Sequence, residues 1–125
     1  MTPNDRKYTK THEWIMVDGD TATVGISDHA QDALGDITFV DPATVGKELK
    51  QGEECAVIES VKAASEIYAP IDGKVAEINT EIDSAPELVN HEPYGLGWIL
   101  KLSNINQSQL DALLDAAAYD ALTGK

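Results

Sequence analysis

The sequence has only one cysteine, Cys55, among its 125 residues, and no apolar run of membrane-spanning length. A lone cysteine excludes an internal disulfide and favours a reducing compartment, so we expect a cytoplasmic protein. A bilayer span needs about 18 consecutive apolar residues, and we therefore expect no membrane segment. Residues 1–10 include basic side chains without an apolar core after them, and they are not predicted to be a secretory signal.

Basic and aromatic residues are also scarce. Nine Lys and Arg stand against 22 Asp and Glu, and the formal net charge of −13 repels nucleic-acid phosphates and anionic membrane surfaces. One Phe, two Trp and four Tyr offer few platforms for stacking bases. We expect neither nucleic acid nor membrane as a partner. The acidity favours solubility, and it would also steer the protein toward basic surfaces.

Motifs for catalysis and metal binding are missing. The sequence contains no Gly-x-x-x-x-Gly-Lys or Gly-x-Gly-x-x-Gly nucleotide loop and no Gly-x-Ser-x-Gly nucleophile elbow. His12, His29 and His91 are far apart in the chain, so no metal site is predicted. Cys55 begins an apolar run and is interpreted as a packing residue. These observations predict a protein that is not an enzyme with chemistry of its own.

The chain does contain many short β-prone segments, separated by Gly and Pro. Asp18-Gly19-Asp20 separates two of them, as in a hairpin. A short helix can follow, capped by Ser27 or Asp28 and ended by Gly35. Further strands are predicted at 36–40, 48–49, 54–61, 65–68, 73–78 and 98–102. Many short strands at close spacing predict a barrel or sandwich.

The last part of the chain has a different pattern. Residues 106–122 contain neither Gly nor Pro, and Leu and Ala recur at helical spacing. Ser108 and Asp111 can form a capping pair at the start of this segment. We therefore predict one domain over 1–125, with a β body at about 8–102 and a C-terminal amphipathic helix at about 106–122.

The most informative stretch is 57–70, in which an apolar strand is followed by small residues and then by a polar strand. Lys62 lies near its middle, and at a hairpin tip its amine would project into water with room beside Ala63. Glu59 and Glu66 flank this lysine nearly symmetrically. Such a lysine is suited to acylation by another enzyme, and the alternative is an ordinary solvated lysine on a turn.

The run Glu59-Ser60-Val61-Lys62-Ala63 resembles the lipoylation motif of the glycine cleavage system H-protein family. The likeness covers nearly the whole chain, because further similar blocks occur in the same order at 8–14, 24–26, 34–37, 70–75, 86–90 and 93–98. So many ordered blocks make the resemblance specific, whereas Val-Lys-Ala alone would be weak.

The resemblance implies a mostly β fold, a hybrid barrel-sandwich of two small antiparallel sheets with short helices and a C-terminal α-helix. It implies lipoate in amide linkage on Lys62, which would be N6-lipoyllysine, with a modification motif of Glu59, Ser60, Val61 and Ala63. It also implies a cleft for the loaded arm, lined at the matching positions by Thr11, Glu13 and Glu66. Carboxylates and hydroxyls suit an ammonium group, whereas the residues alone predict ordinary polar side chains on a strand surface.

The function implied by the resemblance is that of a non-catalytic lipoyl carrier. A family member takes the aminomethyl group of glycine from a pyridoxal-phosphate-dependent glycine decarboxylase and delivers it to an aminomethyltransferase that uses tetrahydrofolate. Dihydrolipoamide dehydrogenase then reoxidises the arm, and lipoyl-attaching enzymes are further implied partners. Tethering raises the effective concentration of the carried group at each active site.

Three alternatives remain open at this point. A biotinyl domain would present Met-Lys-Met, and an acyltransferase lipoyl domain would present Asp-Lys-Ala within a longer chain; the block 11–14 and the C-terminal helix argue against both. A relay that donates lipoate to other lipoylated enzymes would use the same Lys62. A small enzyme acting without partners would tolerate Lys62→Arg.

Overall fold

The computed structural model describes residues 2–124, which form nine short strands, four α-helices and one 3-10 helix. The strands are β1 (Lys7–Tyr8), β2 (Glu13–Asp18), β3 (Thr21–Ile26), β4 (Ile37–Pro42), β5 (Glu48–Leu49), β6 (Glu54–Ser60), β7 (Ala64–Tyr68), β8 (Gly73–Ile78) and β9 (Leu100–Ser103). The helices are α1 (Asp28–Leu34), α2 (Glu81–Ser84), α3 (Leu88–His91), the 3-10 helix η1 (Gln107–Ala112) and α4 (Ala116–Thr123). Within residues 2–124, none of the helices combines the length and the apolar character needed to cross a membrane.

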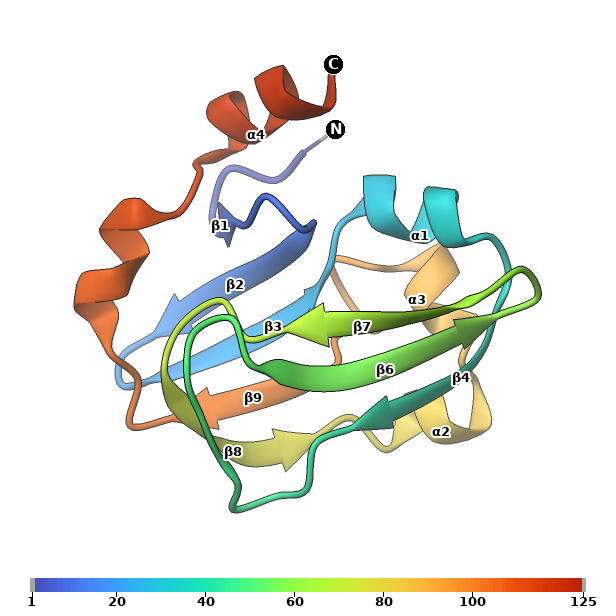
Figure 1. Ribbon diagram of the computed structural model, residues 1–125, viewed down its shortest axis with the longest axis horizontal. Helices are drawn as coiled ribbons and strands as arrows, with labels where there is room; N and C mark the ends of the chain where they lie inside the picture. The colour runs from blue at the N-terminus through green and yellow to red at the C-terminus, as the bar shows by residue number, and fades with distance from the viewer. Residues whose placement is uncertain (1, 125) are drawn as a thin grey trace.

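The strands form two antiparallel sheets that face each other (Figure 1). The larger sheet has the order β1-β2-β3-β9-β8-β5, and the smaller has the order β4-β6-β7. Each sheet ends in two edge strands instead of closing on itself, so the arrangement is sandwich-like. The predicted mostly β fold with two antiparallel sheets is confirmed.

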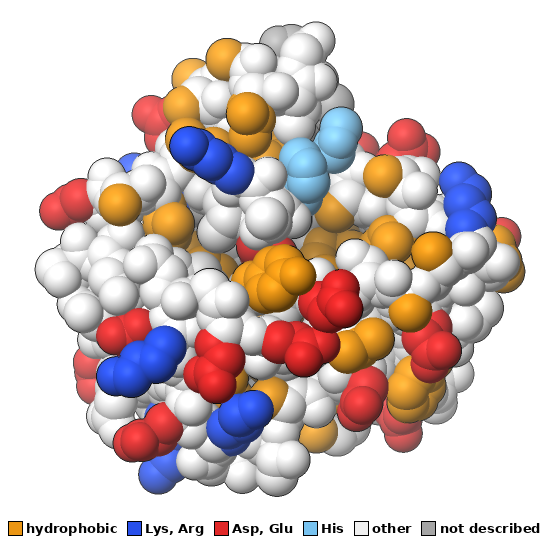
Figure 2. Space-filling model, viewed as in Figure 1, with side chains coloured by type: hydrophobic (Ala, Val, Ile, Leu, Met, Phe, Trp, Pro, Cys, Tyr) orange, Lys and Arg blue, Asp and Glu red, His pale blue; other side chains and the backbone are white. Residues whose placement is uncertain are grey.

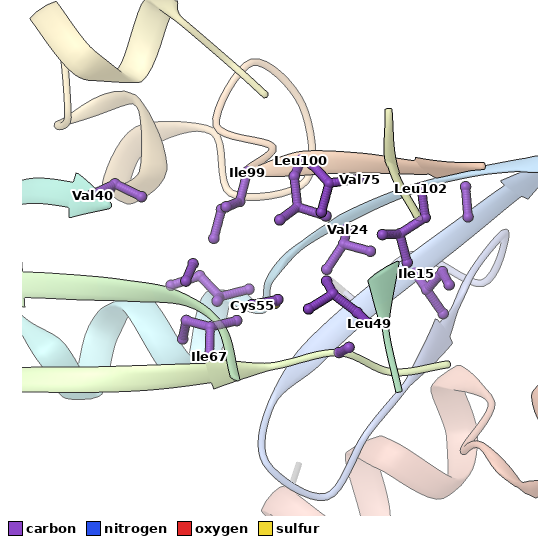
Figure 3. Packing of buried hydrophobic residues seen from close by; sticks show 14 of the residues in the cluster. Ile15, Val24, Val40, Leu49, Cys55, Ile67, Val75, Ile99, Leu100 and Leu102 are labelled. Atoms are coloured by element: carbon purple, nitrogen blue, oxygen red, sulfur yellow. The ribbon is translucent and has the colours of Figure 1, made fainter. Parts of the chain in front are cut away.

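One continuous core lies between the two sheets (Figure 3). Ile15, Val24 and Leu102 contribute from the larger sheet, and Ile67 contributes from the smaller sheet, all of them at most 4% exposed. Figure 3 shows these side chains pointing into the same space. Alternation along each strand leaves the opposite face of the smaller sheet in solvent.

The local turn and helix signals in the first third of the chain are confirmed. Gly19 has a φ of 64° between β2 and β3, which is the left-handed conformation that the Asp-Gly turn requires. The side chain of Ser27 accepts a hydrogen bond from the Ala30 N–H at the start of α1, and Gly35 ends that helix with a φ of 78°. Local chemistry therefore fixes this segment as the sequence predicted.

The prediction of one helix over about 106–122 is wrong. The chain forms η1, then an extended stretch at 113–115, and then α4. In the extended stretch Leu114 pairs with Tyr8 through two backbone hydrogen bonds of 2.8 Å. The side chain of Asp115 then caps α4 by accepting a hydrogen bond from the Ala118 N–H at 2.8 Å. The predicted pair of Ser108 and Asp111 also fails, because the Ser108 hydroxyl donates to Asn106 Oδ1 instead.

The physical reason is a tertiary contact that helical spacing cannot reveal. The edge strand β1 offers backbone groups to Leu114, and this pairing needs extended backbone. Tyr119 of α4 is 2% exposed and stacks on Tyr8, with ring centroids 4.7 Å apart. The C-terminal segment is thus held against β1 at two points, and a single straight helix would lose the backbone pairing.

We predict that Gly25→Ala destabilises the fold by about 1–3 kcal/mol, because overpacked cores lose stability in this range. A β-carbon at Gly25 would lie 2.6 Å from the Trp14 ring, and Trp14 is 1% exposed. Denaturant unfolding measures the loss. In a Trp14→Phe background, where the smaller ring leaves room for the β-carbon, the same substitution should lower the free energy of unfolding by less. An unchanged unfolding midpoint in Gly25→Ala would contradict the prediction.

Candidate functional site

Lys62 lies at the exposed tip of the β6–β7 hairpin. Val61, Lys62 and Ala63 connect the two strands and are all exposed, and the hairpin extends to the edge of the molecule beside α1 (Figure 1). Ser60 organises the turn, because its hydroxyl oxygen lies 3.2 Å from both the Lys62 and Ala63 backbone nitrogens. The Ser60 N–H also donates to the Ala63 carbonyl at 2.8 Å. The turn therefore presents the lysine in solvent, as the sequence predicted.

The hairpin tip also rests on the connection between α1 and β4. The Val61 N–H donates to the Asp36 carbonyl at 3.0 Å. The stem of Lys62 lies beside Gly35, where a β-carbon would be 3.1 Å from Lys62 Cε. Among the described residues, the Lys62 amine has no hydrogen bond or ion pair. The amine is thus directed by its surroundings and remains exposed to solvent.

A cavity of about 270 Å³ lies near the other end of β7. Thr11 and Glu13 of the β1–β2 region line it together with Tyr68 at the end of β7. Its remaining lining comes from Tyr8, Thr9, Lys10, Gln51, Gly52, Ala69, Pro70, Ala112, Leu113 and Leu114. The strand β7 therefore connects the lysine hairpin with the cavity.

Glu13 is the most unusual group in this cavity. Its side chain is 1% exposed, and its Oε1 accepts hydrogen bonds from the hydroxyls of Thr9 and Thr11, at 2.5 and 2.6 Å. Its Oε2 has a longer bond, 3.3 Å, from the Tyr68 N–H. The ion pair found among residues 2–124 joins Arg6 to Asp5, so no described cation neutralises Glu13. The carboxyl group is thus buried at the cavity wall and held by neutral donors among the described residues.

Glu66 is separate from Thr11 and Glu13. It is exposed on β7, opposite Val57, and it does not line the cavity. It lies on the same face of β7 as Tyr68, two residues closer to the hairpin tip. The structure therefore brings Thr11 and Glu13 together and leaves Glu66 between the cavity and Lys62. The sequence did not show that Glu13 is buried or that Thr9 also binds it.

Comparison with known proteins decides the family. The model of the family described as "Glycine cleavage H-protein" matches residues 6–125. This chain belongs to the glycine cleavage H-protein family. The resemblance inferred from the motif at Lys62 and the ordered blocks is thereby confirmed.

Curated relatives and a solved structure agree with this assignment. The chain is 58% identical over 121 residues to the glycine cleavage system H protein of Symbiobacterium thermophilum, covering 97% of this chain and 94% of that protein. It is 54% identical over 117 residues to the glycine cleavage system H protein of Thermus thermophilus, covering 94% and 91%. The crystal structure of a glycine cleavage system H protein from Mycobacterium marinum matches with a TM-score of 0.88 and 36% identity, covering 98% of this chain and 99% of that one.

Two of the three histidines, His12 and His29, lie closer together than the sequence suggested. The rings of His12 and His29 are 4.5 Å apart, and His12 Nδ1 lies 2.7 Å from the Tyr119 hydroxyl. Burial, with a smaller contribution from His29, lowers the pKa of His12. Within residues 2–124 no group of three or more His, Cys, Asp or Glu side chains is placed to hold a metal ion. The hydrogen bond between His12 and Tyr119 ties the loop of Thr11, which leads into β2 at Glu13, to α4.

Cys55 belongs to the core of this family member. It is 1% exposed, and burial raises the pKa of its thiol to about 12. The thiolate is the reactive form of cysteine, so the folded protein keeps this side chain unreactive. The prediction that it is a packing residue agrees with this burial.

We predict that an alkylating reagent at mildly alkaline pH labels Cys55 about 100-fold more slowly in the folded protein than in denaturant. Because the chain has a single cysteine, one mass increment per molecule reports the reaction directly. Stoichiometric labelling of the folded protein within minutes would show that the thiol is accessible and would contradict the prediction.

Proposed function

We propose that this protein is the lipoyl carrier of the glycine cleavage system and that lipoate is attached through an amide to Lys62. The observation that carries the proposal is the exposed amine of Lys62 at a hairpin tip, within the run 59–63 that resembles the family's modification motif. The site fits the group, since the lysine is unpaired among the described residues and its neighbours Ala63 and Ala64 are small and exposed.

The prosthetic group would supply the redox and group-carrying chemistry of a dithiolane. The chain itself has one thiol, Cys55, and it is buried. What the chain contributes is the position of Lys62, set by Ser60 and by the Val61–Asp36 hydrogen bond. We therefore propose a non-catalytic component of a multienzyme system. We also propose that it is located in the cytoplasm, as its single cysteine favours.

We further propose that the cavity beside β7 receives the aminomethyl cargo. Its amine is cationic at neutral pH, and the Glu13 carboxylate offers the charge and hydrogen-bond acceptors that an ammonium requires. Thr11 orients that carboxylate through its 2.6 Å hydrogen bond. Glu13 is 1% exposed, so solvent has little access to its carboxyl group. Glu66 would line the path along β7 between Lys62 and this cavity.

The proposed partners are the glycine decarboxylase, the aminomethyltransferase, dihydrolipoamide dehydrogenase and the lipoyl-attaching enzymes. Acidic side chains gather on the face that carries β6 and β7 (Figure 2). With a net charge of −13, attraction to basic surfaces speeds encounter and weakens as salt rises. Such docking suits a carrier that visits several enzymes and leaves each of them.

We predict that Lys62→Arg abolishes both lipoyl attachment and glycine–bicarbonate exchange with the partner enzymes. Arginine stays charged and does not form the lipoyl amide. Intact mass should show one lipoyl increment on the wild type and none on the variant, and Lys50→Arg, at another exposed lysine, serves as the control. A biotinyl increment, or a lipoyl increment on Lys62→Arg, would refute the assignment. A lipoylated wild type that supports no exchange would favour the lipoate-relay alternative.

A second prediction concerns Glu13→Gln. The variant keeps the shape of the side chain and loses its charge, and a hydrogen bond to a charged group contributes about 1.5–3 kcal/mol. We expect the carrier loaded from glycine, and separated from its partners, to release ammonia about tenfold faster or more. Lipoyl attachment at Lys62 should remain unchanged. Glu66→Gln, outside the cavity, should have a smaller effect, and equal effects of the two substitutions would contradict the proposed cavity.

A further inference from the structure

We propose that Asn90 of α3 is a positioning residue for the acylation of Lys62. Asn90 fixes the segment 35–37, and the hairpin tip with Lys62 rests on this segment. The proposal depends on the proposed lipoylation of Lys62, and it adds a determinant that lies 28 residues beyond the lysine in the chain.

The side-chain amide of Asn90 holds both sides of this segment. Its Oδ1 accepts a hydrogen bond from the Ile37 N–H at 2.9 Å, and its Nδ2 donates to the Gly35 carbonyl at 2.8 Å. The same Nδ2 lies 3.0 Å from Gln31 Oε1 on α1. Gly35 has a φ of 78°, where the chain leaves the helix; its N–H still donates to the Gln31 carbonyl at 3.0 Å, whereas its own carbonyl is one of the helix-end groups that lack a helical partner. Asn90 supplies a partner to that carbonyl and to the Ile37 N–H, and so fixes the path of the chain from α1 into β4.

The segment in turn fixes the backbone and the side chain of the lysine hairpin. The Asp36 carbonyl accepts a hydrogen bond from the N–H of Val61, the residue before Lys62. The missing β-carbon of Gly35 leaves the space in which the Lys62 stem lies, since such a carbon would be 3.1 Å from Cε and 3.6 Å from Nζ. Displacing the segment would therefore release both the turn and the direction of the amine.

The acylation itself needs an accessible and well-directed amine. The Lys62 ammonium loses a proton to solvent, and its nitrogen attacks the carbonyl carbon of an acyl adenylate. The amide C–N bond forms, the bond between the acyl carbon and the phosphate oxygen breaks, AMP leaves, and the nitrogen loses a second proton; nothing is oxidised or reduced. If the tip populates many conformations, only a fraction is competent to bind, and the apparent affinity for the modifying enzyme falls by that fraction.

The test compares the lipoylation kinetics of Asn90→Ala with those of the wild type, using a lipoate–protein ligase with lipoate and ATP and following intact mass. We expect KM for the apo protein to rise about tenfold while kcat changes little. The substitution lowers the fraction of molecules whose hairpin tip can bind the ligase, and leaves the reaction of the bound molecules unchanged. Asn90→Asp retains the acceptor for Ile37 N–H and loses the donations, so its KM should rise less.

The chain offers a matched control in Asn79. Its Nδ2 donates to the carbonyls of Leu96 at 2.9 Å and Trp98 at 2.7 Å, and its Oδ1 accepts from the Glu81 N–H at 3.1 Å. None of these hydrogen bonds involves residues 31–37 or 60–63. Asn79→Ala thus removes an equivalent side-chain network and should leave the KM for lipoylation at the wild-type value.

Amide hydrogen exchange gives a readout that does not depend on the modifying enzyme. The Val61 N–H should exchange faster in Asn90→Ala and at the wild-type rate in Asn79→Ala. A wild-type KM in folded Asn90→Ala, or an equal rise in Asn79→Ala, would overturn the positioning role. Absence of lipoyl from Lys62 of the wild type would instead refute the proposed function on which the inference rests.

Discussion

The packing of the smaller sheet against the larger one is the interaction on which the candidate site depends. Ile58 of β6 and Ile67 of β7 are 0% and 4% exposed on the inner face of the hairpin. Burial of each such side chain contributes about 1.5–3 kcal/mol. The two strands are thereby held along their length, and the three residues beyond them extend into solvent without needing a core of their own. An exposed and yet directed Lys62 is a consequence of that anchoring.

The cavity differs from the hairpin, because it buries the carboxyl group of Glu13 whereas the hairpin exposes the amine of Lys62. Removing a carboxylate from water costs several kcal/mol, and hydrogen bonds offset this only in part. The hydroxyls of Thr9 and Thr11 both donate to Oε1 of Glu13, whereas Oε2 has only the longer bond from Tyr68 N–H. These hydrogen bonds fix the orientation of the carboxyl group, and no ion pair among the described residues involves it. In the proposed function, a cationic cargo would supply such a partner.

Residues close together in the chain were enough to predict several turns and the start of a helix. The Asp18-Gly19-Asp20 turn, the Ser27 cap and the exposed position of Lys62 all follow from side chains within a few residues. The C-terminal prediction failed because Leu114 pairs with Tyr8, more than a hundred residues away in the chain. The burial of Glu13 could not be predicted from its neighbours in the chain either, since its cavity is also lined by Tyr68 and by Leu113 and Leu114 of the distant C-terminal segment.

The cavity and the lysine are linked by a small polar network around Ser27. The Ser27 hydroxyl oxygen accepts from Ala30 N–H and so starts α1, the helix that ends at Gly35 beside the Lys62 stem. The same hydroxyl lies 2.6 Å from the hydroxyl of Tyr119, which lies 2.7 Å from His12 Nδ1. His12 stands between Thr11 and Glu13 in the chain, and Tyr119 anchors the segment whose Leu113 and Leu114 line the cavity. The buried Ser27 hydroxyl, through Tyr119, thus connects α4, the loop of His12 beside the cavity and the helix α1 that ends beside the Lys62 stem. In the proposed function, this network would hold the cavity wall and the lysine hairpin in place while the attached arm moves.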